Sequence, residues 1–69
     1  MNNVDVRKYI INNFKDDSTE ELKQAILDAI TSKTEETLIG LGVLMEVLWN
    51  NSDDEFKNKI INNIKNGLV

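Results

Sequence analysis

The sequence predicts an all-α protein, a compact bundle of three to four short helices around a central apolar helix at about residues 38–50. Apolar residues recur at three- and four-residue spacing, which is helical periodicity. Three serines each precede a glutamate by three residues, a pattern typical of helix starts. The chain has no proline and no Gly/Ser-rich run, so the sequence shows no linker between domains. We therefore expect helices at about residues 4–14, 19–32, 35–50 and 53–66, in a single helical domain covering residues 1–69.

The first expected helix, residues 4–14, has a single apolar face. Val6, Ile10 and Phe14 recur at every fourth position and would lie on one side of about three turns. Asn3 is a suitable N-cap, and Asp5 would lie in the first turn, where the helix dipole favours a negative charge.

The second expected helix, residues 19–32, begins with the clearest start signal in the chain. Ser18 and Glu21 form a capping-box pair, in which the serine hydroxyl accepts from one free amide and the glutamate reaches back to another. One face then carries Leu22, Ala25, Ile26, Ala29 and Ile30. The two small alanines leave room for a closely packed neighbour.

The central stretch, Leu38 to Trp49, carries one charge, Glu46, and is otherwise apolar or glycine. A helix that is apolar nearly all round must be covered on most faces, so we expect it to form the core. It is too short to span a bilayer, which needs about 20 apolar residues. Its main face would carry Leu38, Leu41, Leu44, Met45, Leu48 and Trp49, with Ile39, Val43 and Val47 on the other side.

Two glycines near the start of this stretch, Gly40 and Gly42, weaken a helix by about 1 kcal/mol each relative to alanine. They can permit another helix backbone to approach closely, or residues 38–42 can form a bent entry to the helix. The helix can accordingly begin before or after Gly40. A second capping pattern pairs Ser32 with Glu35 just ahead of this stretch.

The last expected helix, residues 53–66, begins at a Ser52–Glu55 capping pattern. Its predicted buried stripe consists of Phe56, Ile60, Ile61 and Ile64, with lysines on the outside. Asn66-Gly67 is expected to end the helix, because glycine adopts the left-handed conformation that closes one.

Composition and charge restrict the classes of function. The net charge of −4 and the pI near 4.6 disfavour binding to nucleic acid through its phosphates. Without cysteine or histidine the chain has no thiolate ligand and no imidazole base. Its adjacent carboxylate pairs fall in expected first turns, where the helix dipole explains them. We therefore expect no enzyme, metal or cofactor, and the N-terminus predicts a cytosolic protein.

Five residues are candidates for interaction or packing: Gly40, Gly42, Met45, Glu46 and Trp49. We expect Glu46 to reach the surface or pair with a lysine such as Lys8 or Lys57, or else to contact a partner across an interface. Trp49 and Met45 belong either to the core or to an interface hot spot. A 69-residue chain is marginally stable alone, so a homodimer or an unknown protein partner is expected, and no membrane.

The order of these features resembles one known family. The run L-I-G-L-G-V-L-M-E-V-L-W at residues 38–49, with L-D-A-I before it and an Asn-Asn-Ser break after it, is similar to the type I minor small acid-soluble spore proteins of endospore-forming Firmicutes. Their hallmark is L-P-G-L-G-V-L-F-E-V-I-W. Ile39 stands where the family usually has proline, a residue suited to the first position of a helix.

The resemblance implies a protein formed during sporulation in the forespore and kept in the spore core. It carries over no catalytic or binding residue, because the family has no established ones. We expect a non-enzymatic spore component that acts by protein–protein contact or as a stored protein. The alternatives are a DNA-associated spore protein, which salt-sensitive DNA retention would reveal, and a small helical interaction adaptor in growing cells.

Overall fold

The protein is entirely helical over the part of the chain that its computed structural model describes, the backbone of residues 3–69 and the side chains of residues 6–69. Four helices follow one another in the order α1 (Asn3–Phe14), α2 (Thr19–Ser32), α3 (Glu35–Asn50) and α4 (Asp54–Leu68). This confirms the predicted all-α class. The expected capping roles of the Asn3 and Asp5 side chains lie outside the described residues.

The capping box at the start of α2 is formed as predicted. The Glu21 amide donates to Ser18 Oγ over 3.1 Å, and the Ser18 amide donates to Glu21 Oε1 over 3.0 Å. Together these bonds satisfy two backbone amides that a helix start would otherwise leave free. The hydrogen bond from the Ser18 backbone, and then that with its side chain, hold the pKa of Glu21 below its ordinary value of 4.5.

α3 begins at Glu35 as predicted and α4 begins one residue later than predicted, at Asp54, but the residue that caps each helix lies one or two positions beyond the predicted serine. Thr34, not Ser32, caps α3 and accepts from the Thr37 amide. Ser32 is the last residue of α2, and the chain turns at Lys33, whose φ of 55° is left-handed. The Ser32 hydroxyl instead donates to the Ala29 carbonyl of α2 and to Thr37 Oγ1 in the first turn of α3, over 3.3 Å in both cases.

Asp53, not Ser52, caps α4, and its carboxylate accepts from the Phe56 amide over 2.8 Å. The Ser52 hydroxyl instead donates to the carbonyl of Leu48, in the last turn of α3. That carbonyl would otherwise lack a partner at the helix end. Ser52 therefore completes α3 and leaves the start of α4 to its neighbour.

The predicted stop at Asn66-Gly67 is wrong, because α4 continues to Leu68 and Gly67 does not take a positive φ. A left-handed closing turn is normally stabilised by an apolar residue that folds back onto the last turn. Leu68 and Val69 are both highly exposed and make no such return.

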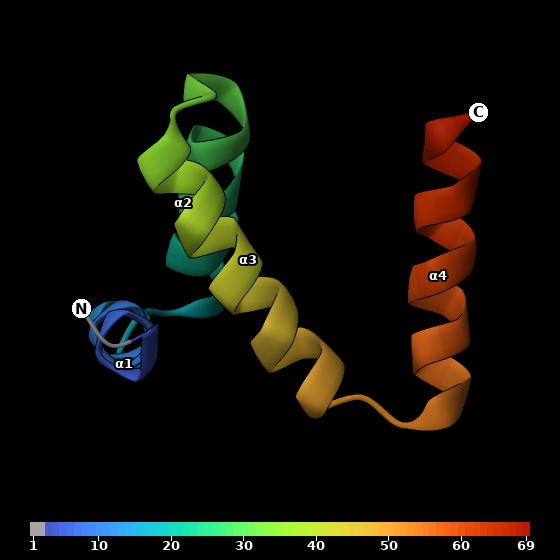
Figure 1. The fold of residues 1–69 in the computed structure, drawn as a ribbon, viewed down its shortest axis with the longest axis horizontal. Coiled ribbons are helices and arrows are strands. Elements are labelled where there is room, and N and C mark those ends of the chain that lie inside the picture. The colour runs from blue at the N-terminus through green and yellow to red at the C-terminus, as the bar shows by residue number, and fades with distance from the viewer. Residues whose placement is uncertain (1–2) are drawn as a thin grey trace.

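α3 is the central helix, and α1 and α2 pack against it, with α2 and α3 joined as a hairpin at Lys33 (Figure 1). α4 stands apart beyond the short turn that follows Asn50 (Figure 1). The radius of gyration is 13.1 Å, near the value of about 11 Å for a fully packed domain of this length and far below about 25 Å for an unfolded chain. The arrangement is thus compact, with one helix held off the rest.

Val43, at 5% exposure, is the one buried apolar side chain among those described. It lies on the side of α3 opposite to the predicted main face, whose members Leu38 and Leu48 are exposed. The periodicity misled here because a helix that is apolar all round gives no signal for which side its neighbours will cover. α1 and α2 cover the side that carries Val43 and also reach Leu41 and Leu44 of the predicted main face, while Leu38 and Leu48 stay exposed.

The two glycines lie within α3, which begins before Gly40 and is a single helix from Glu35 to Asn50. The bent-entry alternative is therefore wrong. A Cβ atom added at Gly40 or Gly42 would meet nothing within 4 Å, so no backbone approaches either glycine within this chain.

Candidate interaction surface

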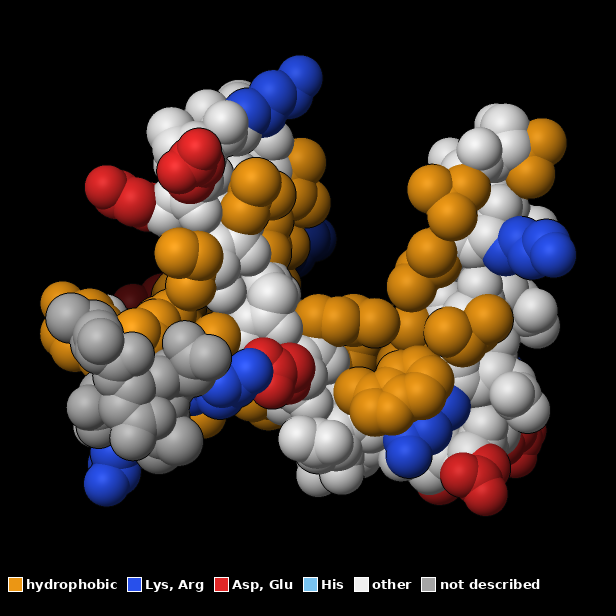
Figure 2. Space-filling model, in the orientation of Figure 1, with side chains coloured by type: hydrophobic (Ala, Val, Ile, Leu, Met, Phe, Trp, Pro, Cys, Tyr) orange, Lys and Arg blue, Asp and Glu red, His pale blue; other side chains and the backbone are white. Residues whose placement is uncertain are grey.

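One side of α4 is apolar and exposed. We call it the α4 stripe, and it consists of Phe56, Ile60, Ile61, Ile64 and Leu68. Phe56, Ile61 and Ile64 are 47%, 48% and 44% exposed, so the prediction that this stripe is buried is wrong for the single chain. Figure 2 shows apolar side chains along the side of α4 that faces α3, where they border an open space. α4 is amphipathic as predicted, but none of the described helices covers its apolar stripe.

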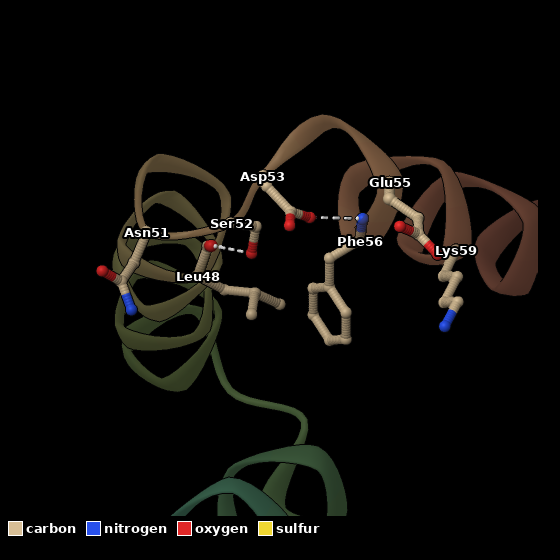
Figure 3. Close-up of a pocket in the computed structure, with 7 residues that line it drawn as sticks. All are labelled: Leu48, Asn51, Ser52, Asp53, Glu55, Phe56 and Lys59. Carbon is tan, nitrogen blue, oxygen red and sulfur yellow. Dashed lines mark hydrogen bonds between the residues drawn. The ribbon is translucent and has the colours of Figure 1, made fainter.

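The turn between α3 and α4 holds the stripe in place. An open pocket of about 440 Å³ at this turn is lined by Leu48, Asn51, Ser52, Asp53, Glu55, Phe56 and Lys59 (Figure 3). The Leu48 and Phe56 side chains extend into the same space (Figure 3). Because Ser52 bonds the end of α3 and Asp53 caps α4, only a short stretch of chain is free of helical hydrogen bonding.

Trp49 provides a second contact across this turn. The Lys57 ammonium lies 5.2 Å from the centre of its ring. At an exposed site such a cation–π contact is worth about 0.5–1 kcal/mol. Trp49 is half-buried beneath Lys57 and does not lie in a closed core. This contact joins the end of α3 to the first turn of α4.

Glu46 lies at the surface, which is one of the predicted alternatives. It also forms an ion pair, but its partner is an arginine and not the predicted lysine. The Arg7 Nε atom donates to both carboxylate oxygens, over 3.1 and 3.0 Å. Neither Lys8 nor Lys57 is used. The pair joins α1 to α3 beside a shallow pocket of about 250 Å³ that Gly42 also lines. Both side chains are about half exposed, so solvent screens the interaction.

Arg7 is the partner of Glu46 that the sequence reasoning missed. It is the only arginine of the chain, and it lies one position from Val6 on the first predicted apolar face. Arginine combines a charge with a planar array of donors and is favoured over lysine for pairing with carboxylates. That preference was the available signal.

A second apolar groove, of about 480 Å³, lies where α1, α2 and α3 meet. Its walls are mainly apolar, and its lining includes Ile10, Phe14, Ala25, Ala29, Leu41 and Leu44, with Gly40 among them. The room that the two alanines were expected to leave is this groove. Asp28 and Glu36 also line it and give it acidic character.

The five predicted residues are not brought together in one site. Gly40 belongs to the α1–α2–α3 groove, Gly42 and Glu46 to the pocket beside Arg7, and Trp49 to the α3–α4 turn. Met45 is half-buried on α3. Their role as interaction residues stays a prediction.

The chemical character of these surfaces is that of apolar contact. Among the described residues, no group of three or more acidic side chains is placed to hold a metal ion. None of the described helices is long and apolar enough to cross a bilayer. What the described surface offers is exposed isoleucine, leucine and phenylalanine side chains.

Comparison with known proteins identifies the family. Residues 4–68 match the model of the family "Small, acid-soluble spore protein I". The protein of that name from Bacillus mycoides is 38% identical over 63 residues, which cover 91% of this chain and 91% of the relative. The one from Bacillus velezensis is 38% identical over 65 residues, which cover 94% of this chain and 92% of the relative. The protein of that name from Bacillus anthracis is 36% identical over 63 residues, 91% of each chain. No solved structure is similar at a significant level. The chain thus belongs to the small, acid-soluble spore protein I family.

Proposed function

We propose that the protein is a non-enzymatic component of the spore core, formed during sporulation, which acts through protein–protein contacts or as a stored protein. The observation that carries this proposal is the family match over residues 4–68, since the relatives bear the name of spore proteins. A chain without histidine or cysteine also lacks the side chains that most often act as catalytic base or nucleophile.

The exposed apolar surface supports a role in protein contact. Soluble monomers rarely leave large contiguous apolar patches open to water, and such patches usually mark interaction sites. The α4 stripe carries four isoleucine, leucine and phenylalanine side chains that are each more than two-fifths exposed: Phe56, Ile61, Ile64 and Leu68. The net charge of −4 adds to this, because it would repel the phosphates of DNA.

The test is an immunoblot of growing cells, sporulating cells and purified spore cores from the source organism, with equal total protein in each lane. A constitutive cytosolic protein serves as loading control, and a strain lacking the gene shows that the antibody is specific. We expect signal only after sporulation begins, retained in the spore core. Equal signal in growing cells would refute the proposal.

A second arm separates protein contact from storage. The gene is replaced by a variant with Ile61→Asp and Ile64→Asp, which removes the apolar character of the α4 stripe without touching the buried Val43. If the protein acts by contact, spores of this strain should match the deletion strain in germination and outgrowth. If it is only stored, they should match the wild type.

A further inference from the structure

We propose that the α4 stripe is covered by the α4 stripe of a second copy of this chain, the two helices running antiparallel about a two-fold axis near Ile60. This inference deepens the proposed function by naming the partner. Its tests are made on the purified chain, so that they can fail independently of where the protein is found in the cell.

The single chain exposes more surface than a compact monomer of its mass, which leaves enough area for an interface. The chain exposes 5992 Å², whereas a compact monomer of its mass, 7.9 kDa, exposes about 4400 Å². The excess is about 1600 Å², while a standard specific interface removes about 800 Å² from each partner. A second copy of the chain would therefore find enough exposed area for a stable dimer, and part of the excess area would stay exposed.

The order of residues along α4 favours self-association over a different protein. Phe56, Ile60, Ile64 and Leu68 follow one another at every fourth position and form one line along the helix. In an antiparallel pair centred on Ile60, that residue meets its own copy. Phe56 then lies opposite Ile64 of the second copy, and the reverse contact forms by symmetry. A surface that matches itself in this way is what a two-fold dimer requires.

The charges at the two ends of α4 fit the same arrangement. Asp54 lies in its first turn and Lys65 in its last turn. With the axis at Ile60, Asp54 of one helix lies beside Lys65 of the other, on the same flank of the stripe. Neither residue forms a salt bridge with a described residue of its own chain. An antiparallel pair also places the positive end of each helix dipole beside the negative end of the other.

The position of α4 leaves this surface accessible. The helix is held off α1 and α2, and its stripe borders the open space beside α3 (Figures 1 and 2). Leu48 on α3 lines the pocket at the α3–α4 turn and is exposed as well. A second copy would cover Leu48 together with the stripe.

Sedimentation equilibrium of the full chain gives the first test. We expect a dimer. A chain that stays monomeric at all concentrations up to the solubility limit would overturn the proposal. A monomer that binds vesicles of phosphatidylglycerol would overturn it as well. Ile60→Asp should yield a monomer. Its far-UV circular dichroism should keep the helical content of α1, α2 and α3, because Ile60 lies outside the packing around Val43. The matched control Asn62→Asp, on the opposite side of α4, should remain dimeric.

Cross-linking tests the register. The chain contains no cysteine, so a single introduced thiol can react only with its own copy. Ile60→Cys should form a disulfide-linked dimer under mild oxidation, since it places two cysteines at the axis. Asn62→Cys, exposed on the far side of α4, is the control and should stay reduced. Faster cross-linking of the control, or equal rates for the two, would overturn the antiparallel register.

Charge reversal tests the ends of the helix. Lys65→Glu should weaken dimerisation by about 2- to 30-fold, because two surface ion pairs per dimer are lost. The double variant Asp54→Lys with Lys65→Glu should recover most of that loss. Lys23→Glu makes the same charge change on α2 and should have no effect. If Lys23→Glu weakens the dimer as much as Lys65→Glu does, net charge is the cause and the assigned pairing is wrong.

A monomer found only in the spore core would overturn this inference and leave the proposed function in place. A dimer found equally in growing cells would do the opposite.

Discussion

Replacing Val43 with alanine should cost a large share of the stability of this chain. The side chain is 5% exposed, the lowest value among the described residues. The change removes the equivalent of two buried methylene groups, about 0.8 kcal/mol each, and leaves a cavity that adds to the loss. We expect a loss of about 1.5–3 kcal/mol. A chain of 69 residues has roughly 3.5–10 kcal/mol in total, so the loss is severe.

The matched control is Val47→Ala, the same substitution one turn further along α3. Val47 is 45% exposed, so little apolar area is removed from a buried position. Alanine is also the better helix former, by up to about 0.6 kcal/mol, and this gain is common to both variants. The difference between them therefore reports burial alone.

The assay is thermal unfolding followed by circular dichroism at 222 nm, a standard wavelength for helix content. All variants are measured at one low protein concentration, so that association contributes equally. For a domain of this size each kcal/mol shifts the midpoint by about 4–8 °C, so Val43→Ala should melt roughly 10 °C below Val47→Ala. Equal midpoints would refute the claim that α1 and α2 pack on the Val43 side of α3.

Three further changes test the caps, the glycines and the ion pair. Glu21→Gln should make the stability of the fold less sensitive to acid. The pKa of Glu21 is lowered in the folded chain, so its contribution to stability is present above the unfolded pKa near 4.5 and is lost as pH falls through the folded pKa. Urea titrations at neutral and acidic pH measure this difference. Gly40→Ala should stabilise the fold by up to about 1 kcal/mol through helix propensity and so raise the melting midpoint, because a Cβ there meets nothing within 4 Å. Arg7→Gln should destabilise by less than about 1 kcal/mol, with the loss disappearing at high salt, since the pair with Glu46 is half exposed.

Each of these has an opposite outcome that would count against the structure. A pH profile unchanged by Glu21→Gln would mean that the capping box does not persist in solution. Destabilisation by Gly40→Ala would point to a close contact at that glycine that the single chain does not contain. A salt-independent loss in Arg7→Gln would mean that Arg7 acts through packing of its alkyl stem.

The helices that the sequence located best are those with strictly local determinants. Ser18 and Glu21 are three residues apart, and both hydrogen bonds of the capping box form within that span. At Ser32 and Ser52 the same pattern occurs, but competing local hydrogen bonds decided the outcome. The hydroxyls of Ser32 and Ser52 each donate to a carbonyl of the preceding helix, and the cap of each following helix lies further along. A pattern of residue types does not rank such competitors.

The interaction surface was harder to predict because it depends on contacts between distant parts of the chain. The α4 stripe was identified as apolar, but periodicity does not say whether a helix of the same chain covers it. The burial of Val43 likewise depends on which side α1 and α2 approach. The Arg7–Glu46 pair joins residues 39 positions apart, a separation at which sequence offers many partners for one carboxylate. The charge of Glu46 predicted that it would pair with a basic residue, and the packing of α1 against α3 determined that this residue is Arg7.

The most direct test of the central claim, that this chain completes its apolar surface with a second copy, is the melting midpoint measured across a wide range of protein concentration. Folding coupled to dimerisation predicts a midpoint that rises steadily with concentration, because mass action favours the associated native state. Ile60→Asp should abolish that dependence. A midpoint that is the same at every concentration for the unmodified chain would contradict the account.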